Sequence, residues 1–185
     1  MTWLPRLISA TFLLCGATAA MAAPAQLAGK SIEVAFSESR MLKDPAAGTV
    51  QPASLAITIK IYVSRKGRIF DNYASQTSSG AASGSQVGGS GSGGPGAVFA
   101  ARDWRFSGNA LVGQHLFERG ARRMTITFNP GLTACTLSVT NGKAAGSDTI
   151  MIISSTTGKR LEVVSSTIGA SCSIRDGNVF GTQQQ

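Results

Sequence analysis

Side chains that could carry out catalysis are few in this 185-residue sequence, and none has a spacing that specifies a reaction. His115 is the only histidine, which excludes a zinc site built from several imidazoles and makes any Ser-His-Asp arrangement depend on this residue. The sequence contains no G-x-S-x-G nucleophile motif. Because residues 111–117 are expected to form a strand, we interpret His115 as a surface or rim residue.

The nine acidic residues make a weak case for hydrolysis. A glycosidase needs two carboxylates that face each other across a cleft, and no spacing in the sequence indicates such a pair. A hydrolase that uses paired carboxylates, with Glu33 or Asp103 among them, is kept as an alternative. No run of alternating carboxylates suited to a metal ion is present, and we expect no catalytic residue, no metal site and no cofactor.

Basic residues are more suggestive, because they give the chain a net charge of +8 and gather at expected turns. The first and last of these groups are Arg65, Lys66 and Arg68, and Lys159 and Arg160. If the strands run simply up and down, both groups lie at the same end of the sheet and form a surface that faces anions. Charged turns also keep β proteins soluble and prevent aggregation at sheet edges, which is the plainer interpretation.

Residues 1–22 have the pattern of a cleaved signal peptide. Arg6 supplies a positive charge, a short apolar run follows, and a small-x-small cleavage pattern ends at Ala22. The run is too short to span a bilayer. Leu14 before Cys15 argues against lipidation, since a small residue normally precedes a lipidated cysteine. We therefore expect export to the periplasm or beyond, with no transmembrane span.

Two cysteines, Cys135 and Cys172, follow this leader. We expect them to form one disulfide within the chain, because exported proteins reach compartments where disulfides persist. Closing a loop of this length stabilises a fold by about 4 kcal/mol on the chain-entropy model. Buried free thiols and a bridge between two chains are the alternatives.

Alternation of apolar and polar residues with a period of two dominates the rest of the chain. The segments that show it, or that form short β-branched runs, are residues 32–36, 55–63, 124–128, 135–139, 150–153 and 161–164. Turn signals that contain Gly separate them. The sequence predicts one all-β domain over residues 23–185, an antiparallel meander of about eight to ten strands in a small barrel or a two-layer sandwich. Trp104 and Phe106 are expected in its core.

One segment departs from this pattern, since 15 of the 22 residues in 75–96 are Gly or Ser. This composition buries too little apolar area to offset the entropy of ordering the chain, and we expect a disordered loop. If strands near residues 68–74 and 97–106 are neighbours, the segment is a long hairpin loop within one domain. A linker between two domains is the alternative.

Several short motifs link the chain to a known group of proteins. They are Phe36-Ser37-Glu38-Ser39-Arg40, Ile61-Tyr62-Val63-Ser64, Gly67-Arg68-Ile69-Phe70, Phe106-Ser107-Gly108-Asn109, Gly120-Ala121-Arg122-Arg123, Cys135, and the tail from Cys172 to Asn178. On these motifs the chain resembles small exported bacterial proteins of unknown function, over most of its length after the leader. The resemblance carries no activity, cofactor or catalytic residue to this chain.

Together these features predict an exported, non-catalytic binding or structural module of the bacterial envelope. Its expected partners are anionic envelope components, either lipid or polysaccharide, and not nucleic acid. A carrier that holds a small apolar ligand inside the barrel is the first alternative, since a barrel of this size can enclose one ligand. The hydrolase with paired carboxylates is the second.

Overall fold

The computed structural model describes residues 23–79, 82–88, 99–100, 104–154 and 157–181 of the chain. This part forms eleven β-strands and one short 3-10 helix, η1 (Ala25–Leu27), and contains no α-helix. The strands are β1 (Lys30–Lys43), β2 (Val50–Val63), β3 (Ile69–Ser79), β4 (Ala82–Gly88), β5 (Phe99–Ala100), β6 (Trp104–Ser107), β7 (Ala110–Phe117), β8 (Gly120–Phe128), β9 (Cys135–Gly142), β10 (Ile150–Ile153) and β11 (Arg160–Asp176). The predicted all-β class is confirmed, with slightly more strands than expected.

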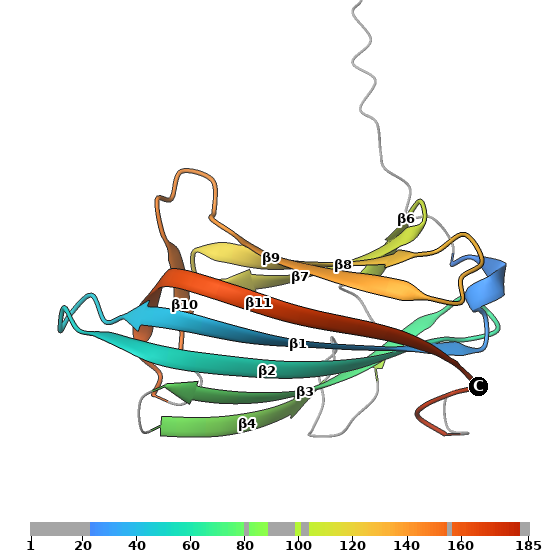
Figure 1. Cartoon of the computed structure of the whole chain (residues 1–185), viewed down its shortest axis with the longest axis horizontal. Coiled ribbons are helices and arrows are strands. Elements are labelled where there is room, and N and C mark those ends of the chain that lie inside the picture. Colours follow the sequence, from blue (N-terminus) through green and yellow to red (C-terminus); the bar gives the residue numbers. More distant parts are fainter. Residues whose placement is uncertain (1–22, 80–81, 89–98, 101–103, 155–156, 182–185) are drawn as a thin grey trace, which may run out of the picture.

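The strands form two antiparallel sheets that stack as two layers (Figure 1). The large sheet has the order β10-β11-β1-β2-β3-β4, with β5 paired to β3, and the small sheet has the order β6-β7-β8-β9. An isolated bridge between Arg119, which follows β7, and Met151 of β10 connects the sheets. The large sheet is curled, so the fold combines features of the barrel and the sandwich that the sequence predicted as alternatives.

The alternation in β1 explains why this sequence forms two layers. Ile32, Val34 and Phe36 are buried between the sheets, whereas Ser39 is exposed on the outer face. The antiparallel register places Ile32 beside the buried Ile61 of β2, so apolar residues continue across neighbouring strands. Each such side chain contributes about 1.5–3 kcal/mol when it is fully buried. The small sheet supplies Trp104, Phe106, Leu111, Met124, Ile126 and Phe128 to the same core.

The Gly/Ser-rich segment is more ordered than its composition predicts. β4 pairs along its whole length with Tyr73–Ser79 of β3, so residues 75–79 and 82–88 are strands and the prediction of a disordered loop is wrong for them. Polar side chains supply hydrogen bonds where apolar burial is scarce. Ser54 Oγ lies 2.7 Å from Ser78 Oγ, and Gln51 Nε2 donates to Ser79 Oγ at 2.9 Å. The β3–β4 ladder holds the hairpin, and these contacts hold its first strand to β2.

Strands on either side of this segment are neighbours, which favours one domain with an insertion over two domains with a linker. Phe70 of β3 pairs with Ala100 of β5, and Asp71 pairs with Phe99. The hairpin partner β4 lies within the insertion, and residues 89–98 fall outside the described residues.

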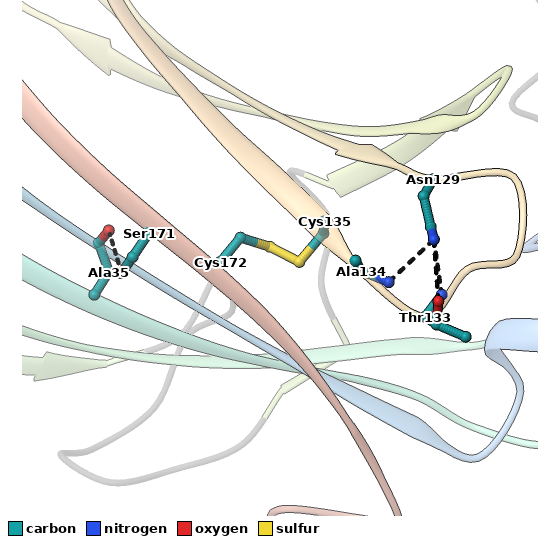
Figure 2. The surroundings of a disulfide bond; sticks show 7 residues. All are labelled: Ala35, Asn129, Thr133, Ala134, Cys135, Ser171 and Cys172. Atoms are coloured by element: carbon teal, nitrogen blue, oxygen red, sulfur yellow. Dashed lines mark hydrogen bonds between the residues drawn. A yellow bond between two sulfur atoms is a disulfide. The ribbon is translucent and has the colours of Figure 1, made fainter.

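Cys135 on β9 and Cys172 on β11 form the predicted disulfide, with their Cα atoms 5.6 Å apart. Figure 2 shows that the bond joins a strand of the small sheet to a strand of the large sheet. Just before Cys135, Asn129 Oδ1 accepts hydrogen bonds from the backbone N–H groups of Thr133 and Ala134 at 2.8 and 3.0 Å (Figure 2). The disulfide therefore closes one lateral side of the two-layer fold.

The expected signal peptide, residues 1–22, lies outside the described residues. Within the described ranges, no helix has the length and apolar character needed to cross a bilayer. A disulfide is typical of proteins that reach an oxidising compartment.

Candidate functional site

The two basic turn groups lie at opposite ends of the large sheet. The β2–β3 turn is next to Lys30 at the start of β1, whereas the β10–β11 turn is next to Lys43 at its end. The prediction that both groups share one end is therefore wrong. The reason is that β9 and β10 belong to different sheets and form no hairpin, so the chain does not alternate regularly between the two ends. The separated groups are Arg65, Lys66 and Arg68 at the first end, and Lys159 and Arg160 at the second.

Acidic partners already neutralise the second group. Lys159 Nζ lies 3.1 Å from Asp44 Oδ2, and Arg160 Nε lies 2.8 Å from Glu118 Oε1. The five basic residues therefore form no common surface for anions.

Of the other residues that the sequence singled out for possible catalysis, the structure describes His115 and Glu33. His115 is exposed, as expected, and its ring meets that of Phe117 edge-on at 5.6 Å. Glu33 forms an ion pair with Arg175 at 3.5 Å, and Asp103 is outside the described residues. Among the described residues, no three His, Cys, Asp or Glu side chains gather where they could hold a metal ion.

A cluster of buried polar side chains lies between the sheets, at the inward positions of β1 that follow its apolar residues. Beyond Phe36, the inward positions of β1 carry Glu38 and Arg40, whose side chains are 0% and 10% exposed. β8 contributes the buried Arg122, which pairs in register with Asn141 of β9. We call Glu38, Arg40, Arg122 and Asn141 the polar cluster.

Arg122 is firmly held in the polar cluster. Glu38 accepts hydrogen bonds from Arg122 Nη2 and, at 2.8 Å, from Asn141 Nδ2, while Arg122 Nε donates to Asn141 Oδ1 at 3.2 Å. The guanidinium also lies between the rings of Phe36 and Phe117, 5.1 and 5.2 Å from their centroids. Charge-assisted hydrogen bonds and cation–π contacts together offset the cost of burying this charge.

Arg40 is held much less well. Its Nη1 lies 3.8 Å from Glu38 Oε2, beyond hydrogen-bond distance, while Arg122 and Asn141 each donate to one oxygen of Glu38. The Nε of Arg40 is buried and has no hydrogen-bond partner within the described ranges. Burial lowers the pKa of the Arg40 guanidinium, and Glu38 acts in the opposite direction. Arginine stays protonated nonetheless, so the cluster sets two cations against one carboxylate.

A cavity of about 400 Å³ extends from the polar cluster along the space between the sheets. β3 forms one wall with the inward residues from Asp71 to Thr77, which cover about 20 Å of extended strand. β7 and β8 form the opposite wall. Most of the remaining lining is apolar, including Leu55, Ile57, Ile59, Phe117 and Met124. The volume falls within the range of about 300–1,000 Å³ that small-molecule sites occupy.

Trp104 borders the end of the cavity that is distant from the polar cluster. Its Nε1 donates to Asp71 Oδ2 at 3.0 Å. The ring lies directly over Gly113 of β7, where a Cβ atom would come within 2.8 Å of the ring carbons. A glycine at this position is therefore required for Trp104 to lie flat against the small sheet.

Asp71 is too distant to balance the charge of Arg40. Their pairing partners on β2 are Ile61 and Ala53 respectively, and these are roughly 26 Å apart along the strand. Two charges at that separation are beyond the screening length of about 8 Å at physiological ionic strength where water intervenes.

A second hollow, of about 670 Å³, lies over the outer face of the large sheet. Short hydroxyl side chains line much of it, among them Ser37, Ser54 and Ser78, and its described lining includes no Arg or Lys. Ser54 and Ser78 already bond to each other. The inter-sheet cavity combines apolar walls with a poorly compensated charge, and we take it as the candidate site.

The sequence also indicates the polar cluster, at positions just outside the segments that are predicted to be strands. Continuing the alternation of residues 32–36 by two more steps places Glu38 and Arg40 on the apolar face. Arg122 is likewise in phase with the apolar Met124. Charged residues that follow the alternation of an apolar face are expected to be buried. Folded proteins rarely bury charged side chains completely unless these are paired.

Comparisons of this chain with protein-family models, with curated proteins and with solved structures find no match. Inference about function therefore starts from the cavity and its side chains.

Proposed function

We propose that this chain is an exported binding module that holds a small, mainly apolar ligand in the cavity between its two sheets. The observation that carries the proposal is the cavity of about 400 Å³ with apolar and aromatic walls and a few buried polar groups. Small-molecule sites typically have this composition. Export to the periplasm or beyond rests on the leader pattern of residues 1–22 and on the disulfide.

The strand arrangement supports entry from one side. The disulfide ties β9 to β11 and closes the side away from the cavity. On the other side, the described residues of β6 pair with Ala110–Gly113 of β7. The rest of β7, which lines the cavity with Gln114 and Phe117, has no strand partner on that edge among the described residues. A ligand that enters along this edge leaves the closed side intact.

The cavity supports this proposal better than the basic turns support contact with an anionic surface. Those turns are separated by the length of the large sheet, and Lys159 and Arg160 already have acidic partners. A hydrolase is less well supported too. The buried carboxylates that lie in or beside the cavity, Glu38 and Asp71, are about 20 Å apart along the sheet, whereas paired catalytic carboxylates lie within roughly 10 Å.

Trp104 provides a direct test of cavity occupancy. In a full chain that carries Trp3→Phe, Trp104 is the single tryptophan. Titration with dodecanoate and with dodecanol, below their micelle concentrations, should change its fluorescence saturably. Native mass spectrometry should show one ligand bound per chain.

A matched pair of variants on β3 locates the ligand. Ser75→Phe places a ring in the cavity, whereas Gln76→Phe places one on the outer face, beside the second hollow. We expect Ser75→Phe to abolish binding and Gln76→Phe to preserve it, with both variants folded by circular dichroism. Binding lost in Gln76→Phe alone, or no binding of either amphiphile to the parent, would overturn the proposal.

A further inference from the structure

We propose that the ligand is an aliphatic carboxylate, whose head group binds Arg40 and whose chain lies along β3 toward Trp104. This inference rests on the proposed function, because it identifies the chemistry of the ligand that the cavity holds. It follows from three features of Arg40: its unused donor, its uncompensated charge and its place in the cavity.

The first feature is the unused donor. Arg40 is nine-tenths buried, and its Nε has no hydrogen-bond partner within the described part of the chain. A buried donor without a partner is costly, and folded proteins leave few of them. A carboxylate fits this donor, because two oxygens can accept from Nε and an adjacent Nη of one planar guanidinium.

The second feature is the charge balance around Arg40. Arg40 and Arg122 act on each other electrostatically, and the carboxylate beside both is Glu38, whose two oxygens already accept from Arg122 and Asn141. The group therefore keeps one net positive charge in a place with little solvent. One bound ligand carboxylate would make the net charge of this group zero.

The third feature is the position of Arg40 in the cavity. Arg40 lies at one end, and the walls beyond it are formed mainly by Ile57, Ile59 and Tyr73, toward Trp104. An inorganic anion would satisfy Arg40 and leave these apolar walls empty. A linear amphiphile fits both Arg40 and the apolar walls, because its head group can bind the guanidinium and its chain can pack against the walls.

The test compares amphiphiles of equal chain length on the Trp3→Phe chain. Dodecanoate should bind at least about tenfold tighter than dodecanol, because a charge-assisted hydrogen bond is worth a factor of this size. Dodecyltrimethylammonium should bind more weakly than dodecanol, and acetate should not bind at concentrations that saturate dodecanoate.

Variants of Arg40, with a variant of an exposed arginine as the control, then test whether Arg40 causes the preference for dodecanoate over dodecanol. Arg40→Gln should reduce the tenfold preference for dodecanoate to about equal binding, whereas Arg40→Lys should restore part of it. The control Arg123→Gln changes an exposed residue of β8 and should leave the preference unchanged. Circular dichroism checks that each variant folds.

Each outcome separates this inference from the proposed function. Equal binding of dodecanoate and dodecanol to the parent, or a preference that survives Arg40→Gln, would overturn the role of Arg40 while the cavity still binds a ligand. Tight acetate binding would overturn the need for an apolar chain. If neither dodecanoate nor dodecanol binds, the proposed function itself fails.

Discussion

The space between the two sheets has two halves that the same strands build in different ways. In the first half, which we call the apolar half, β1 contributes Ile32 and Val34, which are fully buried against apolar residues of both sheets. In the second half, which contains the polar cluster, the inward positions of β1 beyond Phe36 are Glu38 and Arg40. The same pair of strands, β1 and β2, spans both halves, so the change from apolar to charged inward side chains on β1 is what separates the packed core from the polar cluster.

The apolar half is suited to stabilising the fold, and the half with the polar cluster is suited to binding. Cys172 pairs in register with Val34, so the disulfide lies at the apolar half and adds to a region that is already well packed. The polar cluster buries charge, which apolar residues of similar size would replace at little or no cost in stability. Features that break the rules of core packing mark functional sites in many proteins. The contrast can be tested by variants on each side.

Loss of the central carboxylate should have the largest effect. Glu38→Gln leaves two buried guanidiniums without a counter-charge, and we expect the free energy of unfolding to fall by up to about 5 kcal/mol. The control Glu33→Gln removes an ion pair with Arg175 that is largely exposed, and should cost no more than about 1 kcal/mol. Urea denaturation measures both. A loss at Glu38 as small as that at Glu33 would show that the polar cluster does not depend on this charge.

Removal of the disulfide should have the next largest effect and should be confined to stability. Replacing Cys135 and Cys172 with Ser should lower the free energy of unfolding by about 3–4 kcal/mol, because a loop closed by residues 37 apart is released. Dodecanoate affinity should change less than about threefold wherever the variant is folded, since the bond lies at the apolar half. A reducing agent should destabilise the parent equally and leave the double variant unaffected. A large loss of affinity would mean that the two halves are coupled.

The apolar half could be predicted from the sequence in more detail than the polar half. Alternation in residues 55–63 and 124–128 correctly identifies β2 and β8, and the expectation of export correctly predicts the disulfide. The polar cluster escaped prediction because Glu38, Arg40 and Arg122 look like ordinary surface residues unless the phase of each strand is followed to its end. The alternation of apolar and polar residues indicates on which face of a strand each side chain lies, but it does not indicate which sheet the strand joins. For this reason the simple up-and-down order predicts the wrong end of the large sheet for the β10–β11 turn.

The two buried arginines should respond differently to replacement by an apolar residue of similar length. Arg122→Met breaks hydrogen bonds to Glu38 and Asn141 and should cost about 3 kcal/mol or more. Arg40→Met removes a charge with an unused donor and should change stability by no more than about 1 kcal/mol in either direction. Thermal denaturation of the two variants side by side tests this. A loss at Arg40 equal to that at Arg122 would mean that Arg40 serves the fold and not a ligand.

The smallest expected effect concerns the ion pair of the exposed Lys159 with Asp44, which contrasts charge at the surface with the buried charge of the polar cluster. The hydrogen bond from Lys159, followed by those from the backbone N–H groups of Ala47 and Ala46, lowers the pKa of the Asp44 carboxyl. A lowered pKa in the folded state means that ionised Asp44 stabilises the fold above its ordinary pKa of about 3.9, and that this contribution is lost as the pH falls through the folded value. The gap in melting temperature between the parent and Asp44→Asn should therefore be constant above about pH 5 and close under acidic conditions. In a Lys159→Met background the gap should shrink, because the main cause is gone while the backbone hydrogen bonds remain. A gap that persists unchanged at acidic pH would show that Asp44 acts through the shape of its turn and not through its charge.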